Sequence, residues 1–410
     1  MAARTPHPPA EFEGDEFPQL PEEFDQEGAE RLRFVLARDA RVRLDKHLQN
    51  RLRHISRNKV QELIELGGVT VNGARPKAST KLKEGDVIDV ILPPRPTREL
   101  VPEAIPLDIL YEDEHFIVIN KQADIIVHPA RGQMTGTLLN ALAWHFTQAR
   151  GERASHADGS IEGLSHVGAD DARPGIVHRL DRHTTGVIVV GKQDEAHWKL
   201  ARQFEHRTNL KVYLAIVHGC PDPPGGVIEQ PIGKHPIVRE AMAVRHDPSA
   251  KEAVTLYRVR ERYEGYSLVE LELKSGRTHQ IRVHLQYLGY PIVGDLLYGG
   301  EPVGTPELEE PPLPAGYRPN LTYARPREEG DRLEQQVARR RDLIMAVPAL
   351  HATMLGITHP ITDQWMTFTA PVPSPMRDLV RELRKRPADG PVAEHGTWID
   401  LEQALPREES

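Results

Sequence analysis

The stretch IVHRLDRHTTGVIVVG, residues 176–191, decides the fold. Its last part holds four consecutive β-branched residues, Val187 to Val190, which predict a short strand buried in a core. The segment Thr184-Thr185-Gly186 before them is typical of a turn. We therefore expect Asp181 in a polar loop that leads directly into a core strand.

Basic and titratable neighbours surround Asp181 in the sequence, namely His178, Arg179, Arg182 and His183. Nearby positive charge favours the carboxylate form, so we expect the pKa of Asp181 to lie below its usual range. An ionised carboxylate suits the role of a nucleophile or a base and does not suit that of an acid. The alternative is an exposed ion pair, which is the ordinary role of an aspartate between two arginines.

The run His178-Arg179-Leu180-Asp181, followed by Thr184-Thr185-Gly186, resembles the active-site signature of the RluA-type family of RNA pseudouridine synthases. In that family the aspartate of this signature is the catalytic residue, and the resemblance implies this role for Asp181. Arg179 beside it is a candidate either to fill the place of the flipped target base or to hold a phosphate.

Two later segments resemble further motifs of the same family. Lys211-Val212-Tyr213-Leu214-Ala215 resembles the segment whose tyrosine lies against the target base, which implies that role for Tyr213. The alternative for Tyr213 is packing in the core of a strand. Residues 276–284, together with Gly294-Asp295, resemble the third signature, in which an arginine pairs with the catalytic aspartate. That arginine is matched here by Arg282.

The segment 110–121 resembles the opening of the family's catalytic domain, a turn that enters a strand. The family usually continues with Lys-Pro and a glycine two places on, whereas this chain has Gln122 and Asp124. The resemblance implies a catalytic domain over residues 100–385, and two polar stretches, about 150–173 and 300–345, look like insertions in it.

Residues 41–95 predict a small domain of their own. Apolar residues recur at helical spacing in two segments: Leu44, Leu48 and Leu52, then Val60, Leu63 and Ile64. A strand at 69–71 runs into an Asn-Gly hairpin turn, and a second strand follows at 87–91. The polar sides of the helices carry many basic residues, which fits a solvated face or a DNA-reading helix-turn-helix.

The same segment also resembles the small RNA-binding module named after ribosomal protein S-four, which favours structured RNA over DNA as the partner. The candidate RNA-binding residues in it are Arg43, Arg51, Arg53, Arg57 and Lys59. The charge distribution agrees with this interpretation. Residues 41–95 hold twelve Lys and Arg against six acidic residues, although the whole chain carries a net charge of −8.

Acidic residues gather at the two ends of the chain. Residues 1–40 hold ten acidic residues against four arginines, and residues 388–410 hold six against one. The first segment is also rich in proline, so we expect a largely disordered tail there. The second is expected to be an acidic tail that follows the catalytic domain.

Several kinds of site and location are excluded or disfavoured. A single cysteine, Cys220, excludes a disulfide framework and any multi-cysteine metal site. Residues 186–192 have the spacing of a phosphate-binding loop, but Gln193 stands where Ser or Thr is required. We expect no metal and no cofactor. The first residues lack an apolar signal segment and no stretch approaches a membrane span, so we expect a cytoplasmic protein. A monomer is also expected.

The resemblance implies an α+β fold, with a mixed, largely antiparallel sheet and a central cleft. It further implies an isomerase that converts uridines of RNA to pseudouridine, with large-subunit ribosomal RNA as the expected substrate. The alternatives are a transfer RNA synthase, or an RNA-binding ribosome assembly factor whose catalytic fold is silent. Asp181 would either attack the sugar or remove a ribose proton, and these two mechanisms stay open at this point.

Overall fold

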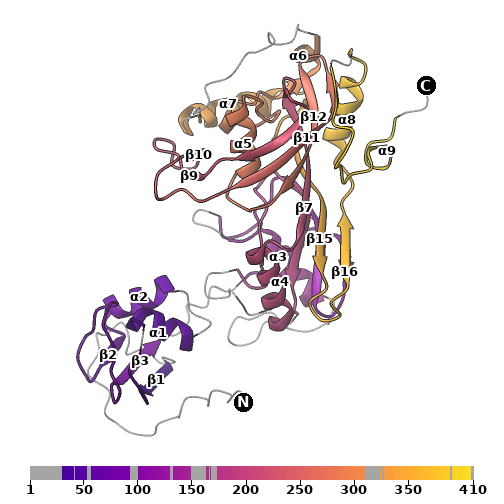
Figure 1. The fold of residues 1–410 in the computed structure, drawn as a ribbon. Helices are drawn as coiled ribbons and strands as arrows, with labels where there is room; N and C mark the ends of the chain where they lie inside the picture. Colours follow the sequence, from indigo (N-terminus) through magenta and orange to yellow (C-terminus); the bar gives the residue numbers. More distant parts are fainter. Residues whose placement is uncertain are drawn as a thin grey trace. The chain divides into compact units, whose positions relative to one another are not determined.

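Two separate sets of strands organise the chain (Figure 1). The computed structural model describes residues 30–40, 42–52, 57–92, 100–129, 133–148, 163–165, 167, 173–309, 324–325, 327–387 and 390–407. The chain divides into two units, Met1–Glu99 and Leu100–Ser410, and each unit has hydrophobic clusters of its own. No helix of the described residues is long and apolar enough to cross a bilayer.

The N-terminal unit packs two helices against a three-stranded antiparallel sheet of order β1-β3-β2. Its elements are β1 (Glu30–Val35), α1 (Leu44–Arg51), α2 (Arg57–Leu66), β2 (Val69–Val71) and β3 (Val87–Leu92). The apolar stripes predicted for the two helices are buried in its core. At the turn after β2, Asn72 and Gly73 both adopt positive φ, as an Asn-Gly hairpin turn requires.

The prediction of a disordered tail through residue 40 is wrong for its last part. Strand β1 pairs along its length with β3, and the alternating side chains of Leu32, Phe34 and Leu36 pack on the domain core. Arg33, between them, forms an ion pair of 2.5 Å with Asp89. The prediction of disorder rested on the acidic composition of the whole segment, and the alternation of apolar residues in it is short. Residues 1–29 lie outside the described residues.

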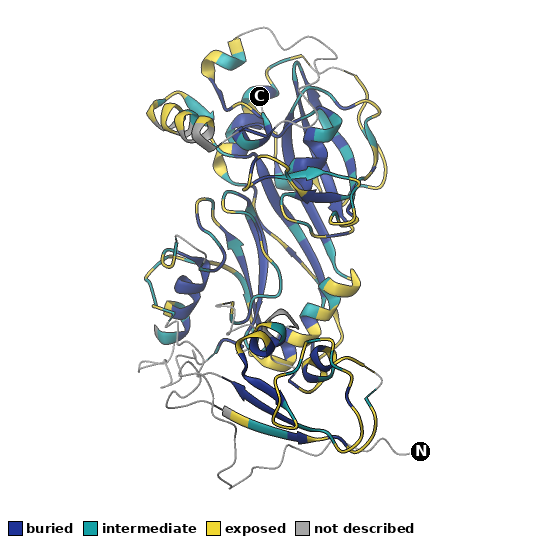
Figure 2. Cartoon of the chain, turned by 90° about the vertical axis from the view of Figure 1, so that its left-hand side faces the viewer, coloured by how far each residue is buried: buried dark blue, intermediate teal, exposed yellow. Residues whose placement is uncertain are grey.

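The C-terminal unit is built on a nine-stranded sheet of order β4-β5-β6-β15-β7-β12-β11-β8, with β16 paired to β15. The strands are β4 (Asp108–Glu112), β5 (Phe116–Lys121), β6 (Thr185–Gly191), β7 (Leu210–His218), β8 (Gly225–Glu229), β11 (Val254–Tyr263), β12 (Tyr266–Leu273), β15 (Leu350–Thr358) and β16 (Trp365–Thr369). Only the β6–β15 pair of these strands is parallel. The predicted α+β class with a largely antiparallel sheet is confirmed. Figure 2 shows the buried residues concentrated along these strands.

Helices and small two-stranded sheets complete this unit. They are α3 (Leu138–Gln148), α4 (Asp194–His206), β9 (Ile232–Lys234), β10 (Met242–Val244), α5 (Gln280–Leu288), the 3-10 helix η3 (Leu296–Tyr298), β13 (Val303–Gly304), α6 (Thr305–Glu309), α7 (Arg327–Arg339), β14 (Leu343–Met345), α8 (Ser374–Leu383) and α9 (Leu401–Ala404). Most of the stretch 150–173 lies outside the described residues. The stretch 300–345 contains β13, α6, α7 and β14, and residues 310–323 of it are likewise not described.

The acidic C-terminal segment is part of the core, which corrects its description as a tail. Ile399 and Leu405 are buried in the main hydrophobic cluster. The carboxylate of Glu270, on β12, accepts the backbone N–H groups of Trp398 at 2.7 Å and Ile399 at 3.2 Å. Glu270 also forms an ion pair with Arg260, on β11. The prediction of a tail rested on the acidic composition of the segment and did not take account of Ile399 and Leu405.

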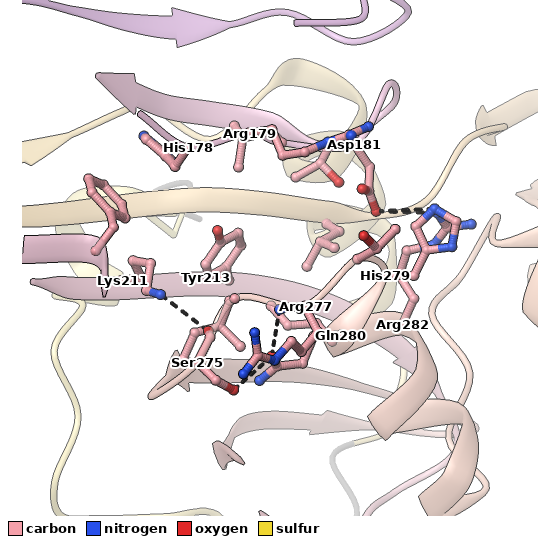
Figure 3. A pocket seen from close by; sticks show the side chains of 18 of the residues that line it. His178, Arg179, Asp181, Lys211, Tyr213, Ser275, Arg277, His279, Gln280 and Arg282 are labelled. Atoms are coloured by element: carbon pink, nitrogen blue, oxygen red, sulfur yellow. Dashed lines mark hydrogen bonds and ion pairs between the residues drawn. The ribbon is translucent and has the colours of Figure 1, made fainter. Parts of the chain in front are cut away.

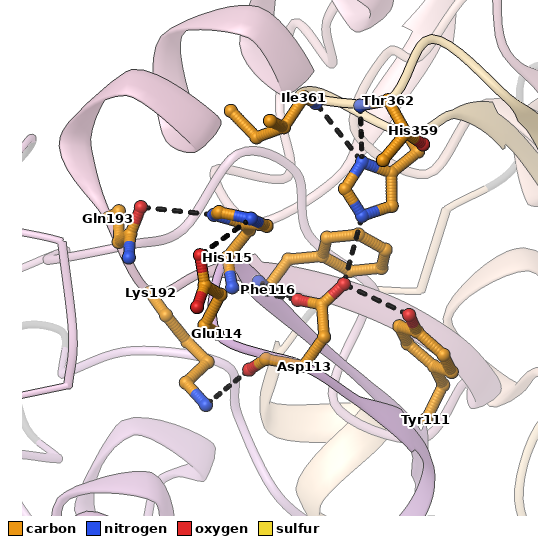
Figure 4. Close-up of polar contacts among 10 residues, drawn as sticks. All are labelled: Tyr111, Asp113, Glu114, His115, Phe116, Lys192, Gln193, His359, Ile361 and Thr362. Atoms are coloured by element: carbon orange, nitrogen blue, oxygen red, sulfur yellow. Dashed lines mark hydrogen bonds and ion pairs between the residues drawn. The ribbon is translucent and has the colours of Figure 1, made fainter.

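A hydrogen-bonded aspartate holds the turn between β4 and β5 (Figure 4). Asp113 accepts the backbone N–H groups of His115 at 2.7 Å and Phe116 at 2.9 Å, and the Tyr111 hydroxyl at 3.0 Å. His359, which follows β15, approaches it through Nε2 at 3.0 Å. Because the His359 Nδ1 accepts two backbone N–H groups, the ring proton lies on Nε2 and is donated to Asp113. The cluster therefore joins the β4–β5 turn, near the start of the C-terminal unit, to the segment that follows β15.

Candidate active site

Asp181 lies in a loop that is anchored on both sides. Leu180 beside it is buried in the core. The ammonium of Lys121, at the end of β5, donates to the Arg182 carbonyl at 2.9 Å and to two other backbone carbonyls. After the loop, Gly186 has a φ of +107°, and a Cβ there would overlap the carbonyl of Ala352 on β15. Only glycine allows β6 and β15 to approach this closely.

The turn near Lys121 explains how this chain departs from the family pattern. Asp124 stands where the family usually has glycine, and it adopts a φ of +64°. Aspartate is one of the few residues with a side chain that enter this region readily. Its carboxylate contacts the Nδ1 of His183 at 2.7 Å, in the loop that carries Asp181. The turn therefore forms without the glycine and gains a contact to the loop that carries Asp181.

A pocket of about 420 Å³ opens beside Asp181 (Figure 3). Its walls come from the 177–184 loop, the end of α4, β7, and the 275–282 segment that leads into α5. The structure therefore brings Asp181, Tyr213 and Arg282 around one cavity, together with the exposed Arg179, although these residues are far apart in the sequence.

Arg282 connects Asp181 to a second, buried carboxylate. Its Nη1 lies 3.3 Å from Oδ2 of Asp181, while its Nε and Nη2 donate to the two oxygens of Asp295 at 2.7 and 2.8 Å. Asp295 is only 1% exposed. The guanidinium also lies 4.9 Å from the ring centroid of Tyr298. The two hydrogen bonds to Asp295 fix the orientation of the Arg282 guanidinium. Its Nη1 group is therefore held in a fixed position beside Asp181.

The electrostatics of the pair keep Asp181 ionised. Burial opposes the charge, but His279, which is positive only when protonated, and Arg282 outweigh it and hold the pKa of Asp181 below its usual range. Burial, with Arg282 nearby, lowers the pKa of His279 to about 4. The His279 ring is therefore uncharged at neutral pH, and Arg282 is the cation that keeps Asp181 as a carboxylate.

His279 contributes a neutral side chain beside Asp181. Its Nδ1 lies 2.8 Å from the Tyr298 hydroxyl, whose oxygen already accepts the backbone N–H of Met242 at 2.9 Å. The hydroxyl proton is then free to point at Nδ1, which places the ring proton on Nε2, 3.9 Å from Asp181. His279 itself adopts a φ of +56° just before α5, and this backbone conformation directs its ring to the pocket.

Tyr213 lies on β7 with its side chain 8% exposed. Burial, with the charge of Asp181 nearby, raises the pKa of its hydroxyl well above the usual value, so the hydroxyl stays protonated at neutral pH. Its ring faces the cavity and not only the core, which fits a stacking surface for a base as well as core packing.

Replacing Tyr213 by phenylalanine separates stacking from proton transfer. Phenylalanine keeps the ring and loses the hydroxyl, whereas leucine loses both. If the protonated Tyr213 hydroxyl relays the proton of carbon 5, giving up its own proton as it accepts that one, we expect the Phe variant to lose about 10²-fold or more in turnover with an unchanged Tm. Single-turnover kinetics and thermal unfolding measure this. Equal losses of rate and stability in the Phe variant would exclude the proton-transfer role.

The predicted RNA-binding residues of the N-terminal unit are only partly described. Arg43 pairs with the buried Asp45 at 3.1 Å and keeps a 46% exposed side chain. Arg51 is exposed and its guanidinium lies 5.2 Å from the Phe34 ring centroid. Arg53 lies outside the described residues, as do the side chains of Arg57 and Lys59, whose backbone is in α2.

Three residues at the site were not singled out from the sequence, although each lies in a motif quoted above. Asp295 was only part of a Gly-Asp match, and His279 was one letter of the third signature. Lys211 stands two positions before Tyr213, and side chains two apart in a strand share a face, so this spacing was the signal that could have identified it. Among the described residues, no three His, Cys, Asp or Glu side chains gather as they would around a metal ion.

Most of the chain is similar in sequence to known proteins. Residues 115–287 match the family model described as RNA pseudouridylate synthase, and residues 42–88 match that of the S4 domain. The chain is 37% identical over 343 residues to an uncharacterized RNA pseudouridine synthase, YlyB, of Bacillus subtilis, covering 84% of this chain and 94% of that protein. It is 36% identical over 370 residues to RNA pseudouridine synthase 2, chloroplastic, of Arabidopsis thaliana, covering 86% and 82%.

A third relative is ribosomal large subunit pseudouridine synthase D of Pasteurella multocida, 36% identical over 345 residues, which covers 83% of this chain and 91% of that protein. The matches cover 82–94% of these relatives' own lengths. The chain therefore belongs to the RluA-type family of RNA pseudouridine synthases, which are isomerases, and it carries an S4 domain in its N-terminal part.

Proposed function

We propose that this isomerase converts specific uridines of large-subunit ribosomal RNA to pseudouridine, with Asp181 as the catalytic carboxylate. The observation that carries the proposal is the Asp181–Arg282 pair, at 3.3 Å, on the wall of a pocket of about 420 Å³. Such a volume lies within the ~300–1,000 Å³ of ordinary small-ligand pockets and fits one flipped nucleotide.

The reaction needs no oxidant and no energy source. The bond from ribose C1′ to uracil N1 breaks, the base turns, and a bond from C1′ to C5 forms. C5 then loses its proton and N1 gains one, so atoms and electrons balance. Asp181 acts at the sugar in one of two ways. It attacks C1′, as the nucleophile of a retaining glycosidase does, and the bond formed breaks when C5 bonds to C1′, or it removes a ribose proton and returns it to the sugar when that bond forms. Arg282 keeps Asp181 charged and oriented, and Tyr213 stacks on the base.

Two observations support ribosomal RNA as the substrate. The relative from Pasteurella multocida is named for the ribosomal large subunit, and it matches this chain over 91% of its own length. Residues 42–88 match the S4 domain, and the sequence of this segment resembles a small RNA-binding module. Since A-form RNA hides its bases in a narrow major groove, an unpaired or loop uridine is the expected target.

Mapping tests the substrate directly. Pseudouridines of total RNA are located site by site in cells with the gene, without it, and with an Asp181→Asn copy. We expect one or a few positions of large-subunit ribosomal RNA to lose the modification in the last two strains. Loss confined to transfer RNA would contradict the proposed substrate. No lost position in any RNA would contradict the activity.

The N-terminal unit should supply most of the RNA affinity. Residues 41–95 carry a net charge of +6, whereas residues 96–387 carry −3. A fragment of residues 100–410 keeps the main hydrophobic clusters and is expected to fold. Because each phosphate contact contributes about 0.7–0.9 to the salt slope, losing three or four contacts should flatten the slope by roughly 2–4 units.

Affinity measured at several salt concentrations, for the full chain and the fragment, checks this division of roles. Turnover at saturating RNA should survive in the fragment because the pocket is intact. An unchanged salt slope would mean that the phosphate contacts lie in the catalytic unit.

A further inference from the structure

Lys211 is a buried cation that lines the pocket. It lies on β7 two residues before Tyr213, so the two side chains share one face of the strand, and both line the cavity, unlike Val212 between them. The side chain is 8% exposed, and its ammonium donates to the Ser275 carbonyl at 3.2 Å. In the described part of the chain no carboxylate forms an ion pair with Lys211, and the charged groups near it are Arg207 and Arg277.

Such a group is costly unless a ligand completes it. A buried ammonium with one neutral protein acceptor has two further N–H donors, and proteins seldom bury a charge without a charged or polar partner. Burial, with Arg207 and Arg277 nearby, lowers the pKa of Lys211 to about 8. That value is above neutral pH, so the group remains an ammonium in the resting enzyme. Because Lys211 lines the pocket, its further donors are available to an acceptor on a ligand that enters it.

The position of Lys211 identifies which acceptor this is. In Figure 3, Asp181 and Lys211 lie on opposite sides of Tyr213. With uracil on the Tyr213 ring and its ribose at Asp181, N1 points to Asp181, and C4 is the ring atom opposite N1. We propose that Lys211 donates a hydrogen bond to the exocyclic oxygen of uracil at this far edge. The proposal rests on the proposed function, since it assumes that the flipped base occupies this pocket.

One donor at this place would serve the whole reaction. When the base turns to bring C5 to C1′, C2 takes the place of C4, so oxygen 2 replaces oxygen 4 in front of Lys211. Between these stages the electron pair of the broken C1′–N1 bond resides on the uracil, and it is delocalised onto both oxygens. A fixed ammonium beside one of them stabilises that charge. Lys211 need not give up its own proton, because in the net reaction the proton that C5 loses is balanced by the one that N1 gains.

The same contact would select the base. Uracil presents an acceptor at position 4, whereas cytosine presents an amino group, which is a donor. A cytidine in the pocket would place that donor against the ammonium and leave both unpaired. Lys211 is therefore expected to be a specificity-determining residue as well as a catalytic one.

The test compares Lys211→Met with Lys199→Met in the full-length protein. Lys199 is a 46% exposed lysine of α4 that pairs with Glu195 and lies outside the pocket lining. The probes are three short RNAs that carry, at the uridine found by mapping, uridine, cytidine or a pyrimidin-2-one nucleotide, which lacks oxygen 4. Binding is measured for all three RNAs, and single-turnover rates for the first.

For the wild type and Lys199→Met we expect uridine RNA to bind about 10-fold more tightly than the other two. For Lys211→Met this preference should disappear, the rate should fall by about 10² or more, and Tm should stay equal or rise, since a buried charge is removed. A phosphate contact would instead weaken all three RNAs equally and lower the salt slope, which would overturn the proposal. So would an unchanged preference, or a lower Tm that accounts for the whole loss. A wild type that forms no pseudouridine in the mapped RNA would refute the proposed function and not this assignment alone.

Discussion

Replacing Asp181 by asparagine should abolish pseudouridine formation. Asparagine keeps the shape of the side chain and can still accept a hydrogen bond from Arg282, which lies 3.3 Å away in the native protein. It carries no negative charge, so it neither attacks C1′ nor removes a ribose proton. A side chain that takes or gives a proton in the transition state typically accelerates a reaction by about 10²–10⁴-fold. We expect the rate of the Asp181→Asn variant to fall by at least that factor.

RNA affinity should hardly change in the same variant, because phosphate contacts dominate binding. Single-turnover rates and filter binding on one RNA measure both quantities. The matched control is Asp124→Asn, since Asp124 is exposed, lies near the same loop, and asparagine also tolerates its positive φ. If the Asp181 variant kept more than about a hundredth of the normal rate, Asp181 would not be the catalytic residue.

Arg282→Met should damage both activity and stability. Asp181 would lose the cation that holds its pKa low, and Asp295, which is 1% exposed, would be left as a buried carboxylate without its bidentate partner. Removing one partner of a buried ion pair typically costs about 3–5 kcal/mol of folding free energy. We expect a clear fall in Tm and a loss of turnover as large as that of the Asp181 variant.

The double variant Arg282→Met/Asp295→Asn separates the two effects. Asparagine at 295 removes the unpaired charge, so much of the lost stability should return. Turnover should remain lost, because Asp181 still has no cation beside it. Thermal unfolding and single-turnover rates of the three proteins check this. Recovery of activity together with stability would show that Arg282 serves folding only and has no role at Asp181.

The sequence predicted the parts of the site that its local patterns encode. The four β-branched residues after Gly186 form β6, and the loop before them carries Asp181 to the pocket. The sequence neighbours of Asp181 predicted a lowered pKa, and the family resemblance implied that Arg282 pairs with Asp181. In the structure Arg282, 101 positions further along the chain, is the main cation at neutral pH, and Arg179, two positions before Asp181, has a smaller influence.

Other features depend on contacts that no local pattern reveals. Asp295, just before η3, meets Arg282 of α5, and Lys211, at the beginning of β7, meets the segment at Ser275. Strand β1 was missed since its alternation is only a few residues long and its surroundings are acidic. In each case the contacting residue is distant in the sequence, so local composition and periodicity could not predict the contact.

The place of β15 in the sheet has a consequence for how the protein is made. β15 lies between β6 and β7, although it is encoded far later, and the Thr185 hydroxyl meets the His351 ring across 166 positions of sequence. A chain emerging from the ribosome exposes β6 and β7 long before the strand that joins them. Pairings of this separation form slowly, and unpaired strand edges favour aggregation. The sheet is therefore completed only near the end of translation, and a nascent chain that stops before residue 350 has both halves of the pocket but lacks the strand that pairs with both β6 and β7.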